Sequence, residues 1–353
     1  MQSAGPILGF GGVSQTQRGS ARSFGRHSSG RGDSAETRKS LCLGSGFGGG
    51  RDPGKTGMKI RLGTRGSPLA LRQAKVVAEK IHRQSPHVEV EQVIVKTSGD
   101  ERSEFGDYAP EQVGEFSSAL ERELTQGMVD LVVHSAKDLP TKIPEELVVE
   151  AYPERVDPRD VLLVRTGDSF QPGSRAVVGT GSPRREMLWK SRWPGSEFRP
   201  IRGNVDRRMK RLLSEDSWWG ILLAAAGLER LGGPLEGLSM ERLGVDWMTP
   251  APGQGALAVE CRTKDNAIRE ILRELDQTDV RACVTAEKGF LQKWGGGCSE
   301  SLGAFAQILS NRTLHLQVAV PNPRGGVLRA QMEAPTTEAE LLGFRLAEEM
   351  QRG

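Results

Sequence analysis

Residues 129–140 read VDLVVHSAKDLP, and this stretch carries the first signal of the fold. The apolar-leaning run at 129–133 predicts a buried strand, and the polar residues after it fall where that strand would leave the sheet. In open α/β sheets, ligands bind just beyond the carboxyl ends of the strands. The adjacent Lys137 and Asp138 are therefore candidate site residues, although a solvated ion pair on a surface turn is the simpler explanation when they are taken alone.

The order strand, turn, helix occurs twice with nearly the same turn. Residues 59–62 lead into Gly-Thr-Arg-Gly-Ser-Pro at 63–68, and residues 177–178 lead into Gly-Thr-Gly-Ser-Pro at 179–183. In each copy the serine, Ser67 or Ser182, is followed by a proline suited to the first helical position. The repeat predicts two α/β domains of similar build, with an anion favoured at each helix start.

The remaining pattern supports the same order of elements. Strands are expected at 88–95, 198–201, 221–226 and 257–260, and helices at 70–81 and 116–124. Residues 250–256 are a turn-rich candidate hinge. The last part changes character: a helix at 284–294 meets a glycine loop, and strands at 304–308 and 314–320 precede a helix at 338–351. This predicts a small α+β unit at the carboxyl end.

Length allows two or three domains, and the composition is as expected of a soluble globular enzyme. The chain has 353 residues, of which 37% are hydrophobic and 26% charged, and no apolar run is as long as a membrane span. The first 57 residues contain eight Arg or Lys and three Asp or Glu, a net charge of +5, so the chain total of +3 leaves −2 for residues 58–353. That balance and the few aromatic residues argue against nucleic-acid binding.

The first 57 residues are rich in Gly, Ser and Arg and have no apolar periodicity, so we expect them to be disordered. Such a segment can be an organelle transit peptide. Alternatively the true start is Met58, where an ordered pattern begins at once, and this second explanation is preferred.

The four cysteines form no CxxC pair and no metal-like spacing with the five histidines. Reduced thiols in an intracellular compartment fit so sparse a set better than a disulfide framework does. No metal site is expected.

The polar residues at the predicted strand ends form one candidate site. They share positive charge or hydrogen-bonding capacity, and they are Arg65, Ser67, Lys137, Asp138, Ser182, Arg184, Arg185, Arg202, Arg208 and Arg230. Guanidinium groups pair bidentately with carboxylates, so the set suits a ligand with several carboxylates. An aspartate among so many cations stays ionised and is suited to stabilising a positive charge or relaying a proton.

From Met58 nearly to its carboxyl end, the chain resembles the hydroxymethylbilane synthase (porphobilinogen deaminase) family. The matching stretches lie at 63–70, 134–140, 179–185, 202–205, 226–230, 252–256 and 296–298. Each is weak alone, but seven in order across nearly 300 residues are specific.

The resemblance implies a transferase of tetrapyrrole (porphyrin, haem, chlorophyll) biosynthesis that joins four porphobilinogens head to tail, releases ammonia and yields linear hydroxymethylbilane. It implies a covalent dipyrromethane cofactor on Cys298, with Asp138 stabilising cationic pyrrole species and managing protons. Lys137 would be another cation of this site. The arginines Arg65, Arg184, Arg185, Arg202, Arg208 and Arg230 would hold acetate and propionate groups, with Ser67 and Ser182 as hydrogen-bond partners.

The resemblance also implies an α/β fold with two domains like type II periplasmic binding proteins and a small α+β carboxyl-terminal domain. We place domain 1 at 58–154 and 250–274, domain 2 at 155–249, and domain 3, with the cofactor cysteine, at 275–353. Among the cysteines, Cys298 alone follows three glycines, which leave room for a bulky adduct. Cys42 lies in the extension, and Cys261 and Cys283 lie in apolar patterns.

The chain departs from the family pattern at four residues and at its end. Val113 stands where a lysine usually contacts the cofactor, Gly295 replaces a glutamate, Pro183 a leucine and Gly181 a serine. The sequence also stops at Gly353, before the usual final helical segment. These departures bear on cofactor contacts and on the stability of domain 3, and they leave Asp138 and Cys298 in place.

The alternative is a non-catalytic anion-binding protein on the same two-domain fold, which would need neither Asp138 nor Cys298. For the enzyme we expect porphobilinogen and the growing polypyrrole as ligands, no nucleic-acid or membrane partner, a monomer, and a cytoplasmic location. An organelle is the alternative if residues 1–57 are a transit peptide.

Overall fold

The computed structural model describes residues 57–96, 115–168, 176–295 and 301–352, and residues 57–353 form one compact unit. The predictions for the amino-terminal extension, for Val113 and for Cys298 lie outside the described residues.

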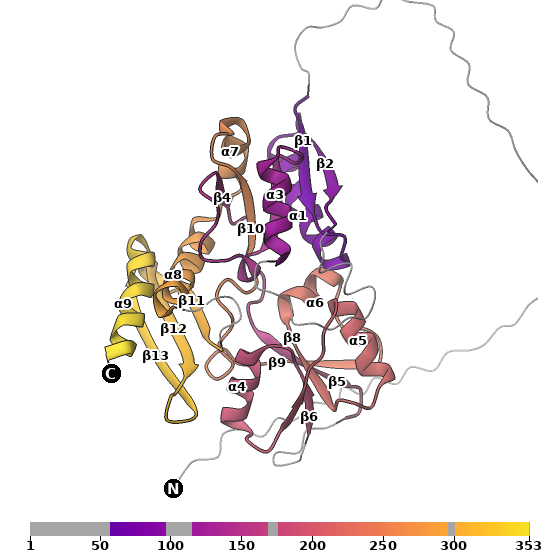
Figure 1. The fold of residues 1–353 in the computed structure, drawn as a ribbon, viewed down its shortest axis with the longest axis vertical. Helices are drawn as coiled ribbons and strands as arrows, with labels where there is room; N and C mark the ends of the chain where they lie inside the picture. The colour runs from indigo at the N-terminus through magenta and orange to yellow at the C-terminus, as the bar shows by residue number, and fades with distance from the viewer. Residues whose placement is uncertain (1–56, 97–114, 169–175, 296–300, 353) are drawn as a thin grey trace, which may run out of the picture. The chain divides into compact units, whose positions relative to one another are not determined.

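The first sheet has five strands in the order β2-β1-β3-β10-β4 (Figure 1). Its strands are β1 (Lys59–Thr64), β2 (Glu89–Ile94), β3 (Leu131–Ser135), β4 (Leu147–Ala151) and β10 (Leu257–Arg262). Strand β1 pairs parallel with β2 and β3, whereas β10 runs antiparallel to β3 and β4. Helices α1 (Pro68–Gln84) and α7 (Asn266–Arg273) pack their apolar side chains on one face, and α3 (Glu115–Thr125) packs on the other.

The second sheet repeats this pattern of parallel and antiparallel pairings, with the order β7-β6-β8-β5-β9. Its strands are β5 (Asp160–Arg165), β6 (Val177–Gly179), β7 (Glu197–Arg199), β8 (Gly220–Ala224) and β9 (Leu238–Arg242), joined by helices α4 (Pro183–Arg192), α5 (Val205–Ser214) and α6 (Ala225–Leu231). Strand β6 pairs parallel with β7 and β8, as β1 does with β2 and β3, and β5 runs antiparallel to β8 and β9, as β10 does to β3 and β4. The prediction of two similarly built α/β domains is confirmed.

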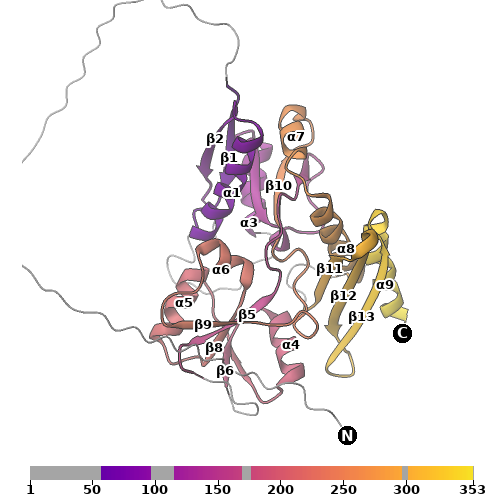
Figure 2. The ribbon, with the colours of Figure 1, turned by 180° about the vertical axis from the view of Figure 1, so that it is seen from behind.

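The carboxyl-terminal part is a three-stranded antiparallel sheet with two helices (Figure 2). It consists of α8 (Thr278–Trp294), β11 (Gly303–Ile308), β12 (Thr313–Pro321), β13 (Val327–Pro335) and α9 (Ala339–Arg352). Both helices contribute to one apolar core with β11 and β12, around the fully buried Phe290 and Leu342. The expected fold class, α/β with a small α+β carboxyl-terminal domain, is confirmed.

Both predicted helix starts are capped as the sequence indicates. Ser67 Oγ accepts a hydrogen bond from the Ala70 backbone N–H at 3.3 Å, and Ser182 Oγ accepts one from that of Arg185 at 3.5 Å. A proline is the first helical residue in each case, where its missing N–H has no intrahelical partner to lose.

Several element boundaries differ from the prediction. The strand expected at 221–226 ends at Ala224, because its partner β5 begins at Asp160, which pairs with Ala224. Ala225 and Ala226 then start α6, as suits the strongest helix former. Strand β3 begins at Leu131 rather than at residue 129, α8 begins at Thr278, and strand β13 was not predicted.

The domain boundaries stay a prediction. The three sheets take their strands from residues 59–151 with 257–262, from 160–242, and from 303–335. Within the described ranges, none of the helices has the length and apolar character needed to cross a bilayer.

Candidate active site

Lys137 and Asp138 lie where the sequence analysis expected them, directly beyond the end of β3. Residues Ala136–Asp138 form a single 3-10 turn in which Lys137 is half-buried and Asp138 is exposed. Neither side chain has a hydrogen-bond or ion-pair partner among the residues described by the structure. Just before the turn, Gln73 Nε2 of α1 donates a hydrogen bond to Ser135 Oγ at 2.7 Å. The turn thus presents one cation and one anion that are available to a ligand.

The surroundings of Lys137 lower the pKa of its ammonium group. Burial lowers its pKa to about 8, and the positive charges of Arg185 and Arg184 act in the same direction. Asp138 and Asp160 oppose this shift. Lys137 therefore shares one electrostatic environment with the arginines that open α4, as the candidate site requires.

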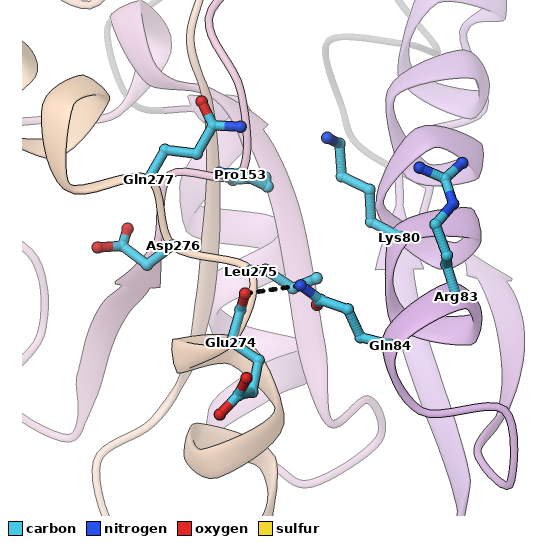
Figure 3. A pocket seen from close by; sticks show the side chains of 8 residues that line it. All are labelled: Lys80, Arg83, Gln84, Pro153, Glu274, Leu275, Asp276 and Gln277. Atoms are coloured by element: carbon cyan, nitrogen blue, oxygen red, sulfur yellow. Dashed lines mark hydrogen bonds between the residues drawn. The ribbon is translucent and has the colours of Figure 1, made fainter.

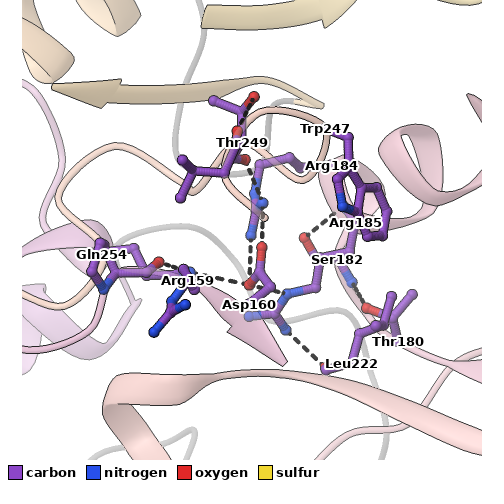
Figure 4. Close-up of polar contacts among 12 residues, drawn as sticks. Arg159, Asp160, Thr180, Ser182, Arg184, Arg185, Leu222, Trp247, Thr249 and Gln254 are labelled. Carbon is purple, nitrogen blue, oxygen red and sulfur yellow. Dashed lines mark hydrogen bonds and ion pairs between the residues drawn. The ribbon is translucent and has the colours of Figure 1, made fainter. Parts of the chain in front are cut away.

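Arg184 and Arg185 bind a buried carboxylate of the protein itself (Figure 4). Arg184 Nη1 lies 2.7 Å from Oδ2 of Asp160, its Nη2 lies 3.1 Å from Oδ1, and Arg185 Nε lies 2.9 Å from Oδ1. Arg184 also donates to the carbonyl of Thr249, and Arg185 donates to that of Leu222. The two side chains are 4% and 8% exposed, so much of their capacity for donating hydrogen bonds is used internally.

The Asp160 cluster, comprising Asp160, Arg184, Arg185 and Gln254, carries a net positive charge. Burial alone would raise the pKa of Asp160, but the two guanidinium groups hold it well below its ordinary value. Gln254 Nε2 donates a fourth hydrogen bond to Asp160 Oδ1 at 3.0 Å. With two cations and one anion, the cluster keeps one fixed positive charge beside Lys137.

Arg230 occupies the last turn of α6, and not the end of a strand as its position after an apolar run suggested. Its Nη2 donates to Glu154 Oε1 at 3.1 Å and to the Gly255 carbonyl at 2.8 Å. The side chain is 6% exposed, and its buried Nε has no hydrogen-bond acceptor in the part of the chain that the structure describes. A buried donor without an acceptor is costly, so this nitrogen fits a ligand oxygen.

The remaining predicted residues surround the starts of α1 and α5. Arg65 and Ser67 precede α1, Arg202 precedes α5, and Arg208 is in its second turn, where Nε donates to the Gly203 carbonyl at 2.6 Å. A β-carbon added at Gly227 of α6 would lie 3.6 Å from Leu69 of α1 and 3.7 Å from Val205 of α5. These contacts bring two helix N-termini together, where backbone N–H groups favour an anion.

The predicted hinge at 250–256 packs directly behind the Lys137–Asp138 turn. Gly253 has φ +76°, and a β-carbon there would lie 3.0 Å from the Ala136 carbonyl carbon and 3.1 Å from the Lys137 nitrogen. Its N–H donates to Glu287 Oε2 of α8 at 2.6 Å. Only glycine combines that backbone conformation with so close an approach.

A separate cavity of about 210 Å³ lies between α1 and the segment that joins α7 to α8 (Figure 3). Its walls combine basic Lys80 and Arg83 with acidic Glu274 and Asp276. None of the predicted site residues lines it. The cavity connects to them through Lys80 Nζ, which lies 3.8 Å from the Glu154 carboxylate that pairs with Arg230.

Sequence reasoning missed three residues of the site region: Asp160, Gln254 and Glu287. Asp160 opens an otherwise apolar strand, and Glu287 lies on a helix face lined by alanine, valine and phenylalanine. Both carboxylates are 0% exposed and accept arginine hydrogen bonds, Glu287 from Arg155 at 2.7 Å. A charged residue at a predicted core position is the signal that could have found them.

Comparison with known proteins gives matches over most of the chain. Residues 60–270 match the family described as porphobilinogen deaminase, dipyromethane cofactor binding domain, and residues 281–352 match its C-terminal domain. The chain belongs to the porphobilinogen deaminase family. The porphobilinogen deaminase of Mycolicibacterium gilvum is 39% identical over 303 residues, covering 82% of this chain and 95% of the relative. That of Syntrophus aciditrophicus is 37% identical over 298 residues, covering 83% and 95%.

This membership favours the enzyme over the non-catalytic anion-binding alternative. Solved structures with some likeness include an ancestral cationic amino acid solute-binding protein, 12% identical with a TM-score of 0.39, covering 62% of this chain and 87% of that one. The BenM effector-binding domain is 13% identical with a TM-score of 0.38, covering 64% and 90%. With TM-scores this low, neither structure adds to what the family match shows.

Proposed function

We propose that the chain is a hydroxymethylbilane synthase that condenses four porphobilinogens into linear hydroxymethylbilane with release of ammonia. One observation carries the assignment: the family match at 60–270 contains a turn whose Lys137 and Asp138 have no partner among the described residues and lie beside a positively charged cluster. Each porphobilinogen brings two carboxylates and one ammonium group, for which such a site offers cations and one carboxylate.

The residues of the site fit a dipyrromethane cofactor in their chemistry. Its carboxylates require donors, and the acceptor-free Nε of Arg230, the cation of Lys137 and the converging starts of α1 and α5 supply them. Cys298 is the attachment residue. When bound, the cofactor supplies the pyrrole carbon to which the first porphobilinogen is added.

Asp138 acts on the substrate pyrrole. When the aminomethyl carbon of porphobilinogen loses ammonia, positive charge develops on the ring nitrogen, and the exposed carboxylate stabilises it. After the carbon–carbon bond forms, the attacking ring carbon loses its proton, and Asp138 relays that proton towards solvent. Lys137 and the arginines bind the acetate and propionate groups, with Ser67 and Ser182 as hydrogen-bond partners.

Arg184 and Arg185 act on the ligand mainly through their net charge, because Asp160 already occupies part of their hydrogen-bonding capacity. Arg65, Arg202 and Arg208 face the anionic groups from the starts of α1 and α5. The enzyme works as a cytoplasmic monomer in haem and other tetrapyrrole biosynthesis and has no nucleic-acid or membrane partner. The free, buried Cys261 and Cys283 are compatible with a reducing compartment.

Turnover of porphobilinogen by the purified full chain tests the proposal. Ammonia release and the mass of the product are measured for the parent and for Asp138→Asn. The variant should lose about a hundredfold in kcat while KM changes little, because it loses the charge that opposes a developing cation. Asp216→Asn is the matched control, since that carboxylate is solvent-exposed and lies 3.6 Å from Arg165, which is not one of the predicted site residues. Binding of porphobilinogen without ammonia release would favour the anion-binding alternative.

A further inference from the structure

Helix α8 contacts the Lys137–Asp138 turn through two residues that lie one helical turn apart. The fully buried Val284 packs in one apolar cluster with Ala136 and Leu139, which flank the two charged residues. Four residues later, Lys288 Nζ donates a hydrogen bond to the Leu139 carbonyl at 2.5 Å. Positions i and i+4 share a helix face, so Val284 and Lys288 hold the turn from the same side.

The turn is fixed at each of its ends, while the side chains of Lys137 and Asp138 have no hydrogen-bond or ion-pair partner among the described residues. Before it, Ser135 Oγ accepts from Gln73, and the Ala136 N–H donates to the Ala256 carbonyl at 3.0 Å. After it, Leu139 is held by Lys288. The contact with Lys288 is the only one of these polar contacts that comes from the carboxyl-terminal domain.

Neighbouring residues strengthen the connection between α8 and the back of the turn. Glu287 accepts from the Gly253 N–H at 2.6 Å, and Gly253 touches the backbone of Ala136 and Lys137 so closely that a β-carbon would not fit without movement. Helix α8 ends at Trp294, four residues before Cys298. One rigid helix therefore contacts the turn and leads, in sequence, to the expected cofactor cysteine.

We propose that Lys288 is a positioning residue that holds the backbone beside Asp138 in register with helix α8. This rests on the proposed function, in which Asp138 acts on a pyrrole delivered by a chain anchored at Cys298. Displacements of about 1 Å can cost about a hundredfold in rate, so loss of the Lys288 contact at Leu139 should have a measurable effect. Lys288 itself does not touch the reacting atoms.

The test compares Lys288→Met with Lys288→Arg in the full-length, cofactor-loaded protein. Lys288→Met should lower kcat by about tenfold or more with KM within about twofold, and it should speed amide hydrogen exchange in residues 134–140. Lys288→Arg, which keeps a long cationic donor, should restore both. Intact mass should show the same two-pyrrole adduct in each variant, since the tether does not take part in its attachment.

Lys293→Met is the matched control, because it removes a lysine from the same helix that pairs with Glu348 of α9 and not with the turn. It should leave kcat and exchange in residues 134–140 unchanged. Lys288→Gln serves as a second variant if Lys288→Met fails to fold, because its shorter side chain also loses the Leu139 contact.

Unchanged kcat and unchanged exchange in the Lys288 variants, with normal adduct, would overturn the proposal. Asp138→Asn measured in parallel separates this from failure of the proposed function. If Asp138→Asn abolishes turnover and Lys288→Met does not lower it, only the role of Lys288 is wrong. If Asp138→Asn keeps full turnover, the catalytic assignment is wrong, whatever the exchange data show.

Discussion

The carboxylate of Asp160 accepts hydrogen bonds from both terminal nitrogens of Arg184. Oδ2 lies 2.7 Å from Nη1, and Oδ1 lies 3.1 Å from Nη2. This pair lies between strand β5 and the first turn of α4, and Arg185 joins it at 2.9 Å. A residue expected to bind ligand carboxylates is thus already paired with a carboxylate of the protein. Arg184 and Arg185 therefore have a structural role, pairing with Asp160, in addition to the proposed role in ligand binding.

Asp160→Asn should lower the free energy of unfolding at pH 7 by about 3–5 kcal/mol, because it leaves two buried guanidinium groups without their anion. Urea denaturation measures this loss. The acid dependence follows from the lowered pKa of Asp160, whose stabilising effect is complete above its unfolded value of about 4. It is lost as the pH falls through the depressed folded value. The parent should therefore lose more stability than the variant below about pH 4, and equal acid slopes would contradict the assignment.

Arg185→Leu should reduce the fraction of chains that carry the two-pyrrole adduct, or raise KM for porphobilinogen, because it removes one of the two cations of the Asp160 cluster. Arg192→Leu is the control, since Arg192 is exposed and its guanidinium group lies over the rings of Trp193 and Trp247. Arg211 is unsuited to this purpose, because it pairs with Glu215 and lies over the Trp218 ring.

Intact mass and steady-state kinetics measure the outcome for both arginine variants. Equal effects of Arg185→Leu and Arg192→Leu on the adduct fraction and on KM would show that the Asp160 cluster contributes no more to ligand binding than any surface arginine does. An unfolded Arg185→Leu would assign the residue to stability alone.

Lys137 predicts a pH limit on substrate binding. The pKa of Lys137 is about 8 in the folded protein and about 10.4 in the unfolded chain. Below pH 8 the half-buried positive charge therefore lowers the free energy of unfolding. This loss disappears as the pH rises from about 8 to 10. Substrate binding weakens over the same rise in pH, because the neutral amine of Lys137 attracts the substrate carboxylates less than the ammonium group does. The ratio kcat/KM, which reports the free enzyme, should fall above about pH 8.

Lys137→Arg should move this basic limb to higher pH, because a guanidinium group stays protonated. Lys142→Arg is the matched control, since Lys142 is exposed five residues further along and should keep the parent profile. A basic limb that does not move in Lys137→Arg would show that another group limits binding.

The sequence could predict the parts of the fold that depend on local chemistry. Ser67 with Pro68 and Ser182 with Pro183 defined both helix starts, because a cap and a fixed φ act within a few residues. The repeated turn indicated two similar domains, and the two sheets share one pattern of parallel and antiparallel strand pairings. The position of the Lys137–Asp138 turn was also correct, because it follows directly from the end of a buried strand.

What the sequence could not predict depends on pairing between distant residues. Asp160 and Arg184 are 24 positions apart, and nothing local shows that they meet or that strand β8 must end where β5 begins. For the same reason the sequence did not distinguish among the candidate arginines. In the structure, Arg184 and Arg185 form buried ion pairs with Asp160, and Arg230 pairs with Glu154. The Lys288–Leu139 contact joins residues 149 positions apart.

The most direct test of the account is the intact mass of the purified full chain, followed by tryptic mapping. We predict a two-pyrrole adduct on the peptide that follows Lys293 and runs from Trp294 to Arg312, which contains Cys298. Cys298→Ser should lack it, whereas Cys261→Ser and Cys283→Ser should keep it, because burial raises the pKa of both thiols to about 12 and suppresses their thiolates. An unmodified parent, even after incubation with porphobilinogen, or an adduct on another peptide, would contradict the central claim.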